Sequence, residues 1–290
     1  MAMSVNQGFE LFLSRLVPTQ AEVQAAASHR ASVEAKLKAN FGISRFWQSG
    51  SFSHGTGVRY RSDVDYFASM PLPRPSSSTT ALNSVKQALV ERFPGTSIYV
   101  DRPAVVVAFG GGAETYEVIP AYLADADDGS DKLAYQIAGS GGSWIKAAPD
   151  SHLSYVNDCN KKPSLGKAKG MARILKAWKY YRSVPVSSFY LEMRAAKYVA
   201  GESQIFWLMD LKYLLRELRD GGLASMNDPT GASGRFDACK TSVQKEESLS
   251  KLDTAISRAN NAYEADRAGK TWEAFYYLGL LFNGEFPSYG

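Results

Sequence analysis

The spacing of hydrophobic residues changes about halfway along the chain. In the first half, short apolar runs separated by loops predict five strands: ISRFW, VDYFASM, TSIYVD, AVVVAF and TYEVIPAY. Apolar residues recur every three or four positions over Phe9–Phe41, around Pro18, and again in ALNSVKQALVERF, which predicts helices there. GGGAE between the last two strands is a hairpin signal. The first half is therefore predicted to mix strands and helices.

From about Lys161 onward the period is helical. The predicted helices are KGMARILKAWKYYR, SSFYLEMRAAKYVA, IFWLMDLKYLLRELRD, LSKLDTAISRANNAYEADRAG and TWEAFYYLGLLF, and GGLASMNDPTGASG interrupts them as a loop. We expect an α+β protein in two domains: a core over residues 1–160 that includes the N-terminal helix, and a helical domain over residues 161–290.

Composition narrows the class of protein. The 290 residues are 45% hydrophobic, 21% charged and 12% aromatic, so a packed interior is expected and disorder is not. The net charge of +4 is too small to indicate nucleic-acid binding by itself. Cys159 and Cys239 stand outside any CxxC pair, which argues against a zinc site or a disulfide scaffold. No signal peptide or membrane-spanning run is visible, so a cytoplasmic protein is expected.

The stretch GSFSHGTGVRYRSDVDYF, residues 50–67, carries the clearest chemistry. Asp63 and Asp65 are two positions apart on a predicted strand, so their side chains share one face. Two close carboxylates repel each other unless cations lie between them, and oxygen ligands suit Mg²⁺ or Mn²⁺. Gly50 and Ser51 form a turn with little side-chain bulk, whose N–H groups are suited to hold a phosphate. Together these features predict phosphoryl or nucleotidyl transfer.

The combination G-S-x-x-x-G-T followed by D-x-D resembles the signature of polymerase-β-type nucleotidyltransferases. More narrowly, the chain resembles the cGAS/DncV-like nucleotidyltransferases of bacterial anti-phage (CBASS) systems, whose domain is also called SMODS. The stretches that carry this are GSFSHGTGVRYRSDVD, YEVIPAY, ILKAWKYYRSVPVSSFYLEMRAAKY, NDPTGASG and EAFYYLGLLFNGEFPSYG. The resemblance implies a mixed-sheet catalytic core, a C-terminal helical domain that binds nucleotide, and an active site in the cleft between them.

That family places a third carboxylate on a neighbouring strand. Here it falls on Glu117 in YEVIP, where aspartate is more usual. Strand alternation puts Glu117 on the opposite face from Tyr116 and Val118, as expected for one acid that faces a cleft. Asp101 is the alternative third acid.

Residues 161–182 contain eight Lys or Arg and no acid. At helical spacing, Lys169, Arg173 and Lys176 share one face and would form a cationic ridge. By resemblance, Lys176 is the lysine that reaches the β- and γ-phosphates, and Ser188 contacts the same triphosphate. Phe189 matches the aromatic residue that stacks on a nucleobase, with Tyr190 as the alternative.

The resemblance implies an enzyme that condenses two or three NTPs, ATP and/or GTP, into a cyclic di- or trinucleotide and releases pyrophosphate. Two Mg²⁺ or Mn²⁺ ions would be held by Asp63, Asp65 and Glu117. The product would bind a downstream effector in anti-phage signalling, and a ubiquitin-ligase-like partner is predicted to act on Gly290. Two alternatives stay open: a nucleotidyltransferase that modifies an RNA, protein or small-molecule acceptor, and an inactive sensor that binds nucleotide or RNA.

Overall fold

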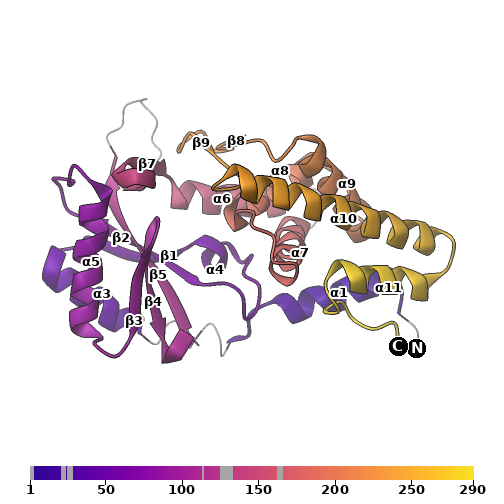
Figure 1. The fold of residues 1–290 in the computed structure, drawn as a ribbon, viewed down its shortest axis with the longest axis horizontal. Coiled ribbons are helices and arrows are strands. Elements are labelled where there is room, and N and C mark those ends of the chain that lie inside the picture. Colours follow the sequence, from indigo (N-terminus) through magenta and orange to yellow (C-terminus); the bar gives the residue numbers. More distant parts are fainter. Residues whose placement is uncertain (1–2, 21–23, 25–28, 113, 125–132, 162–165) are drawn as a thin grey trace.

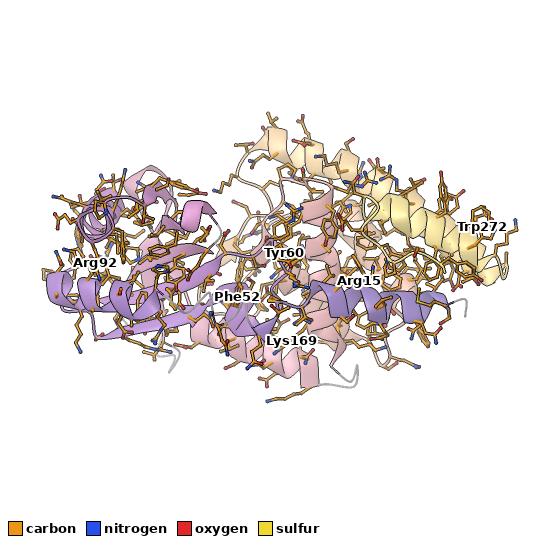
Figure 2. The ribbon with its side chains drawn as sticks, turned by 90° about the horizontal axis from the view of Figure 1, so that it is seen from below. Arg15, Phe52, Tyr60, Arg92, Lys169 and Trp272 are labelled. Carbon is orange, nitrogen blue, oxygen red and sulfur yellow. The ribbon has the colours of Figure 1, made fainter. Side chains whose placement is uncertain are left out.

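The structure, a computed structural model, describes residues 3–20, 24, 29–112, 114–124, 133–161 and 166–290. Part of the predicted helix Phe9–Phe41 and the start of the basic stretch, residues 162–165, lie outside the described residues. An α/β half and a helical half lie side by side (Figure 1). Figure 2 shows Arg92 in the α/β half and Trp272 at the far end of the helical half, with Phe52, Tyr60 and Lys169 near the junction.

The described part of the α/β half is built on one mixed sheet. Its order is β1-β2-β5-β4-β3, and β6 and β7 extend it from β5. Only β2 and β5 run parallel, and the remaining neighbours are antiparallel. All five predicted strands are present, and β6 and β7 were not predicted. The bounds are β1 Arg45–Ser49, β2 Val64–Met70, β3 Ser97–Asp101, β4 Ala104–Phe109, β5 Glu114–Leu123, β6 Tyr135–Ala138 and β7 Trp144–Ala147.

Strand alternation gives the sheet two different faces. Tyr66 and Tyr116 point into a buried core beneath α3, Arg30–Phe41, and α5, Ser78–Arg92. Their strand neighbours therefore point to the opposite face, which is the face that carries the acidic residues described below. Between β4 and β5 lies the short 3₁₀ segment η1, Gly110–Gly112, and a second one, η2, Ser140–Gly142, joins β6 to β7.

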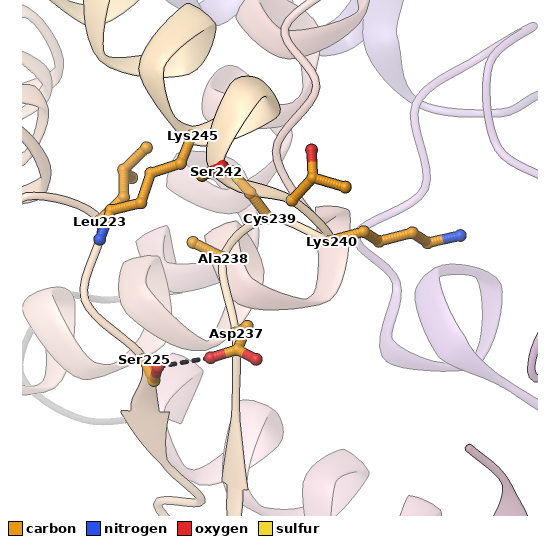
Figure 3. Close-up of a pocket in the computed structure, with 9 residues that line it drawn as sticks. Leu223, Ser225, Asp237, Ala238, Cys239, Lys240, Ser242 and Lys245 are labelled. Carbon is orange, nitrogen blue, oxygen red and sulfur yellow. Dashed lines mark hydrogen bonds between the residues drawn. The ribbon is translucent and has the colours of Figure 1, made fainter. Parts of the chain in front are cut away.

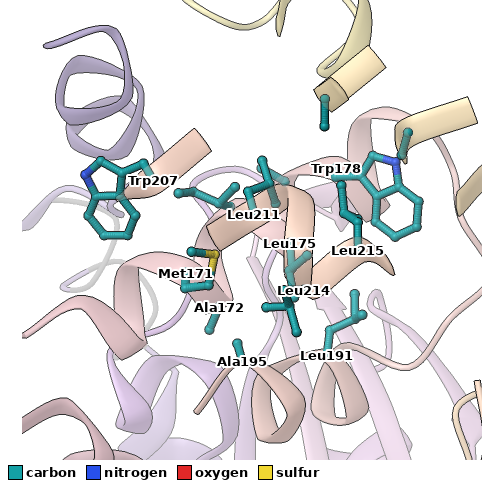
Figure 4. Close-up of a cluster of buried hydrophobic side chains, with 14 of the residues drawn as sticks. Met171, Ala172, Leu175, Trp178, Leu191, Ala195, Trp207, Leu211, Leu214 and Leu215 are labelled. Carbon is teal, nitrogen blue, oxygen red and sulfur yellow. The ribbon is translucent and has the colours of Figure 1, made fainter. Parts of the chain in front are cut away.

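The second half is helical, as predicted. A two-stranded ribbon interrupts the helices: β8 lies within the predicted loop, and β9 follows directly after it. The bounds are α6 Pro149–Lys161, α7 Lys167–Tyr181, α8 Ser188–Gly201, α9 Trp207–Asp220, β8 Met226–Asn227, β9 Arg235–Phe236, α10 Ser242–Arg267 and α11 Thr271–Leu281. Figure 4 shows how α7, α8 and α9 meet through Leu175, Leu191 and Leu214. Gly170 allows α7 to pass close to Trp207 at the start of α9, because a Cβ on residue 170 would lie 2.6 Å from the Trp207 ring.

The N-terminal helix α1, Val5–Leu16, packs with the helical half. Its Phe12 ring lies 4.6 Å from the ring of Phe282 and 5.2 Å from that of Phe286. The sequence-based division placed this helix with the residue 1–160 core, whereas its apolar face is buried in the other half. The boundary at residue 160 stays a prediction. Within the described ranges, no helix combines the length and apolarity needed to cross a bilayer.

Candidate active site

Three acidic residues come together at one end of the parallel strand pair. Asp65 lies directly opposite Glu117 in the register of β2 and β5, and Asp63 immediately precedes β2. Val64 and Val118 point to the opposite, buried face, so alternation directs Asp65 and Glu117 the same way. A hydrogen bond joins the Asp65 and Glu117 carboxyl groups.

The electrostatics of these acids show how crowded they are. Desolvation, followed by the charges of Asp65 and Asp63, raises the pKa of Glu117 to about 8. Desolvation also raises the pKa of Asp65 to about 6, and it raises the pKa of Asp63. The pair Asp65 and Glu117 therefore shares a proton at neutral pH. The fully ionised form of Asp65 and Glu117 is therefore unfavourable unless a cation binds next to them.

The donor set suits a hard divalent cation, since carboxylate oxygens are the ligands that Mg²⁺ and Mn²⁺ prefer. As they stand, the described residues include no group of three or more His, Cys, Asp or Glu side chains already arranged to hold a metal ion. What they include is a carboxyl pair that shares one proton beside a third acid, so metal binding would release that proton.

Asp101, the alternative third acid, lies at the end of β3 on the sheet edge. Its carboxylate is exposed and accepts a hydrogen bond from Lys240 Nζ at 3.4 Å. The charge of Asp101 raises the pKa of both Asp63 and Glu117, so it lies within electrostatic reach. The structure nevertheless places Glu117 directly beside Asp65.

Gly50 and Ser51 open a five-residue helix, α4, Gly50–His54, where the sequence predicted only a turn. Gly50 has φ +59, and a Cβ built on it would lie 1.8 Å from Asp65 Oδ2. Only glycine fits here, because both its left-handed backbone and its contact with the carboxylate exclude a side chain. The backbone of α4 therefore rests directly against the acids.

The ammonium of Lys176, predicted to reach a triphosphate, is buried and paired within the protein. Its side chain is 1% exposed, and its ammonium pairs with Glu192 and donates to Thr56 Oγ1 at 2.9 Å. Arg173, from the same predicted ridge, donates to the carbonyl oxygens of Gly55 and Gly57. Arg173 and Lys176 thus contact the segment that follows α4 and are held by the protein itself.

Lys179, one turn further along α7, contacts Ser188, the other residue predicted to bind the triphosphate. Its Nζ donates to Ser188 Oγ at 2.9 Å, and Tyr180 OH lies 3.2 Å from the same oxygen. Desolvation, followed by the charge of Lys176, lowers the pKa of Lys179, and the charge of Asp63 opposes this. Lys179 and Ser188 therefore lie across from the acids, on the helical side of the junction.

The two candidate base-stacking residues differ in accessibility. Tyr190 is completely buried and donates its hydroxyl to Ala224 O at 2.9 Å. Phe189 is half-buried, with its ring 4.9 Å from the His152 ring and 4.8 Å from the Phe236 ring. Of the two, only Phe189 keeps surface open for a ligand.

Residues 3–160 match the model of the SMODS family, described as the Second Messenger Oligonucleotide or Dinucleotide Synthetase domain. That match covers more than half of the chain. The chain belongs to the SMODS family. The probable cyclic nucleotide synthase IK1_05630 of Bacillus cereus (strain VD146) is 23% identical over 224 residues, which are 73% of this chain. The match covers 64% of that relative, so this chain spans less than two thirds of its length.

Solved structures give the same fold for this SMODS chain. CdnC of E. coli MS115-1, determined with ATP, superposes with a TM-score of 0.76 at 15% identity over 99% of both chains. The cyclic AMP-GMP synthase DncV of Vibrio cholerae, in complex with the linear intermediate pppA(3′,5′)pG, gives a TM-score of 0.78 at 14% identity, covering 99% of this chain and 97% of its own. The predicted α+β fold with a C-terminal helical region is confirmed.

A surface pocket lies elsewhere on this SMODS chain. Its volume is about 230 Å³, and it lies where β8 and β9 meet the start of α10, lined among others by Ser225, Cys239 and Lys245 (Figure 3). None of the three acids lines it, and neither does Lys179 or Ser188. It is therefore separate from the candidate active site.

Sequence reasoning missed four residues at or behind the site: Lys179, Tyr180, His54 and Glu192. Lys179 was detectable, since it lies one helical turn after Lys176 in KAWK. The structure buries His54 beside Glu192. No local pattern links His54 to Glu192, because they are 138 positions apart.

Proposed function

We propose that this SMODS chain is a nucleotidyltransferase that joins two or three NTPs into a cyclic oligonucleotide and releases pyrophosphate. One observation carries the proposal: Asp65 and Glu117 lie opposite each other on parallel strands, with the Gly50 backbone against Asp65. This arrangement puts a phosphate-binding backbone next to a cation-binding pair.

Each residue has a proposed role. Asp63, Asp65 and Glu117 would hold two Mg²⁺ or Mn²⁺ ions. When bound, the ions would supply charge neutralisation for the triphosphate and acidify the attacking ribose hydroxyl. Gly50 and Ser51 orient the triphosphate through backbone N–H groups.

The helical half supplies the remaining contacts. We assign the triphosphate contact to Lys179 with Ser188, because the ammonium of Lys176 is already committed to Glu192. Phe189 stacks on a nucleobase, an interaction that tolerates different bases. Held between these contacts, the two reacting groups meet in a fixed geometry, which is the main source of rate in such transfers.

The relatives' names support the substrate class, since one is solved with ATP and another with a linear pppA(3′,5′)pG intermediate. We therefore propose ATP and/or GTP as substrates, a cytoplasmic enzyme, and a product that signals to an effector in anti-phage defence. A further complex pairs CdnC with a HORMA protein, so a protein partner is part of the proposal. Conjugation at Gly290 by a ubiquitin-ligase-like enzyme stays a prediction from the resemblance alone.

The test is incubation of the purified protein with all four NTPs and Mg²⁺ or Mn²⁺, followed by mass spectrometry and phosphatase treatment. We expect a phosphatase-resistant product without any added acceptor, and none from Asp65→Asn. Nucleotide transfer only to an added acceptor would replace the proposal with the acceptor-modifying alternative. NTP binding without turnover would replace it with the sensor.

A further inference from the structure

A buried polar cluster packs against the Gly50–Gly57 segment, and the charges of two of its members, Lys176 and His54, reach Asp65. It consists of His54, Thr56, Lys176 and Glu192, which are 3%, 0%, 1% and 2% exposed. One Glu192 oxygen pairs with His54 Nδ1, and the other accepts from Thr56 Oγ1 and Lys176 Nζ. The Glu192 carboxylate is thus the centre to which the other three groups attach.

The Glu192 carboxylate at the centre of this cluster is ionised. Burial raises the pKa of Glu192, but Lys176 and the hydrogen bond from His54 outweigh it and hold that pKa well below its usual range. Buried ion pairs add little to the free energy of unfolding, because the cost of desolvating the two charges offsets most of their attraction. They are better at fixing one geometry, since any displacement leaves a buried charge unpaired.

The geometry fixed here is that of the segment that contacts the acids. Glu192 holds His54 at the end of α4 and Thr56 two residues later, while the Thr56 N–H donates to Ser51 O at 2.9 Å. At the front of the same segment, Gly50 lies directly against Asp65. The segment is therefore held between Asp65 on one side and Glu192 on the other.

We propose that Glu192 is a positioning residue: through His54 and Thr56 it sets the position of the Gly50–Ser51 backbone relative to Asp65, without touching substrate itself. This inference rests on the proposed function, because it assigns that backbone to a triphosphate. It differs from a purely structural role, which would affect folding and leave triphosphate affinity unchanged in the folded protein.

The experiment measures binding and not turnover, so it does not depend on the product. Glu192→Gln keeps the shape of the side chain and removes its charge. Asp210→Asn is the matched control, because Asp210 is another buried carboxylate, 1% exposed, which accepts from Tyr198 OH at 2.8 Å within the helical half. Affinity is measured by calorimetry for α,β-methylene ATP, α,β-methylene GTP and inorganic tripolyphosphate, at a temperature where each variant is folded by circular dichroism.

We expect both substitutions to lower Tm, and only Glu192→Gln to weaken binding of all three probes, by about 10-fold or more. Thr56→Val, which removes a single donor, should weaken binding in the same direction. Combined with Glu192→Gln, it should add little, because both act through one contact. If Glu192→Gln does not fold, Thr56→Val alone decides the question.

Unchanged tripolyphosphate affinity in folded Glu192→Gln or Thr56→Val would overturn the inference, and so would an equal loss in Asp210→Asn. A wild-type protein that binds the probes but makes no cyclic product would refute the proposed reaction alone. The binding data alone would then decide the positioning role of Glu192.

Discussion

Replacing Gly50 by alanine should separate the geometry of the site from the stability of the fold. A Cβ at residue 50 would lie 1.8 Å from Asp65 Oδ2 and 2.5 Å from its Cγ. Contacts below 3.0 Å do not occur for real Cβ atoms, so the carboxylate must retreat by more than about 1 Å. Because the side chain of Asp65 can rotate, the clash is relieved by moving the acid and leaves the sheet in place.

The expected magnitudes follow from this geometry. A non-glycine residue at φ +59 costs about 1 kcal/mol of stability, since the left-handed region disfavours a Cβ. Displacing a reacting group by about 1 Å costs about 100-fold in rate. We therefore predict that Gly50→Ala unfolds at a slightly lower temperature and loses about 100-fold in kcat for nucleotide condensation.

Gly42→Ala is the matched control. Gly42 also has a left-handed backbone, φ +67, but no atom lies within 4 Å of the position of its Cβ. It should show the same loss of stability in thermal unfolding and a normal rate in a pyrophosphate-release assay. A Gly50→Ala rate within a few-fold of wild type, or an equal loss of activity in Gly42→Ala, would show that the contact between residue 50 and Asp65 does not set the rate.

Three further predictions concern the acids and the α7–α8 side. With a chelator present, folded Glu117 keeps its proton up to a pH of about 8, whereas the unfolded chain releases it near 4.5, so the free energy of unfolding should fall as pH rises through that window. Glu117→Gln should flatten this pH profile and raise the free energy of unfolding at pH 8 by on the order of 2 kcal/mol. An unchanged pH slope of thermal unfolding in the variant would contradict this. Lys179→Met should lower kcat/KM about 10- to 100-fold with little change in Tm. Lys176→Met should instead lower the free energy of unfolding by about 3–5 kcal/mol, because it removes the ammonium partner of the buried Glu192 carboxylate and leaves it only His54 and Thr56. The reverse ranking would return the phosphate role to Lys176. Phe189→Ala should weaken binding of α,β-methylene ATP and GTP by about 1–3 kcal/mol each, and calorimetry that shows equal affinity in the variant would remove the stacking role.

Local pattern was enough to predict the strands that carry the acids. Alternation over VDYFASM and TYEVIPAY predicted β2 and β5, and it predicted that Glu117 points away from the face of Tyr116 and Val118. Asp63, which was predicted on the same strand as Asp65, lies just before β2. That Asp65 and Glu117 are direct neighbours is a matter of register, which depends on how the two strands pair. The sequence supplied no signal for that pairing, and only the resemblance suggested it.

Long-range packing decided the features that were missed. The strands β6 and β7 have four residues each, too few for a clear alternation. Spacing along α7 puts Lys176 and Arg173 on one face, but it does not reveal that the carboxylate of Glu192 lies opposite that face. For the same reason, the apolar stripe of α1 predicts a helix without indicating which half buries it.

Several energetically unfavourable features of this chain lie close to one another. Two carboxyls with raised pKa, a left-handed glycine against one of them and a buried ion pair behind it all lie around residues 50–65. Each of these lowers or fails to raise stability, so a sequence selected for stability alone would replace them with apolar residues of similar volume. A cluster of such features around one backbone segment is what a site for charged ligands requires, since ligand and cation binding restore the favourable energy that folding alone does not provide.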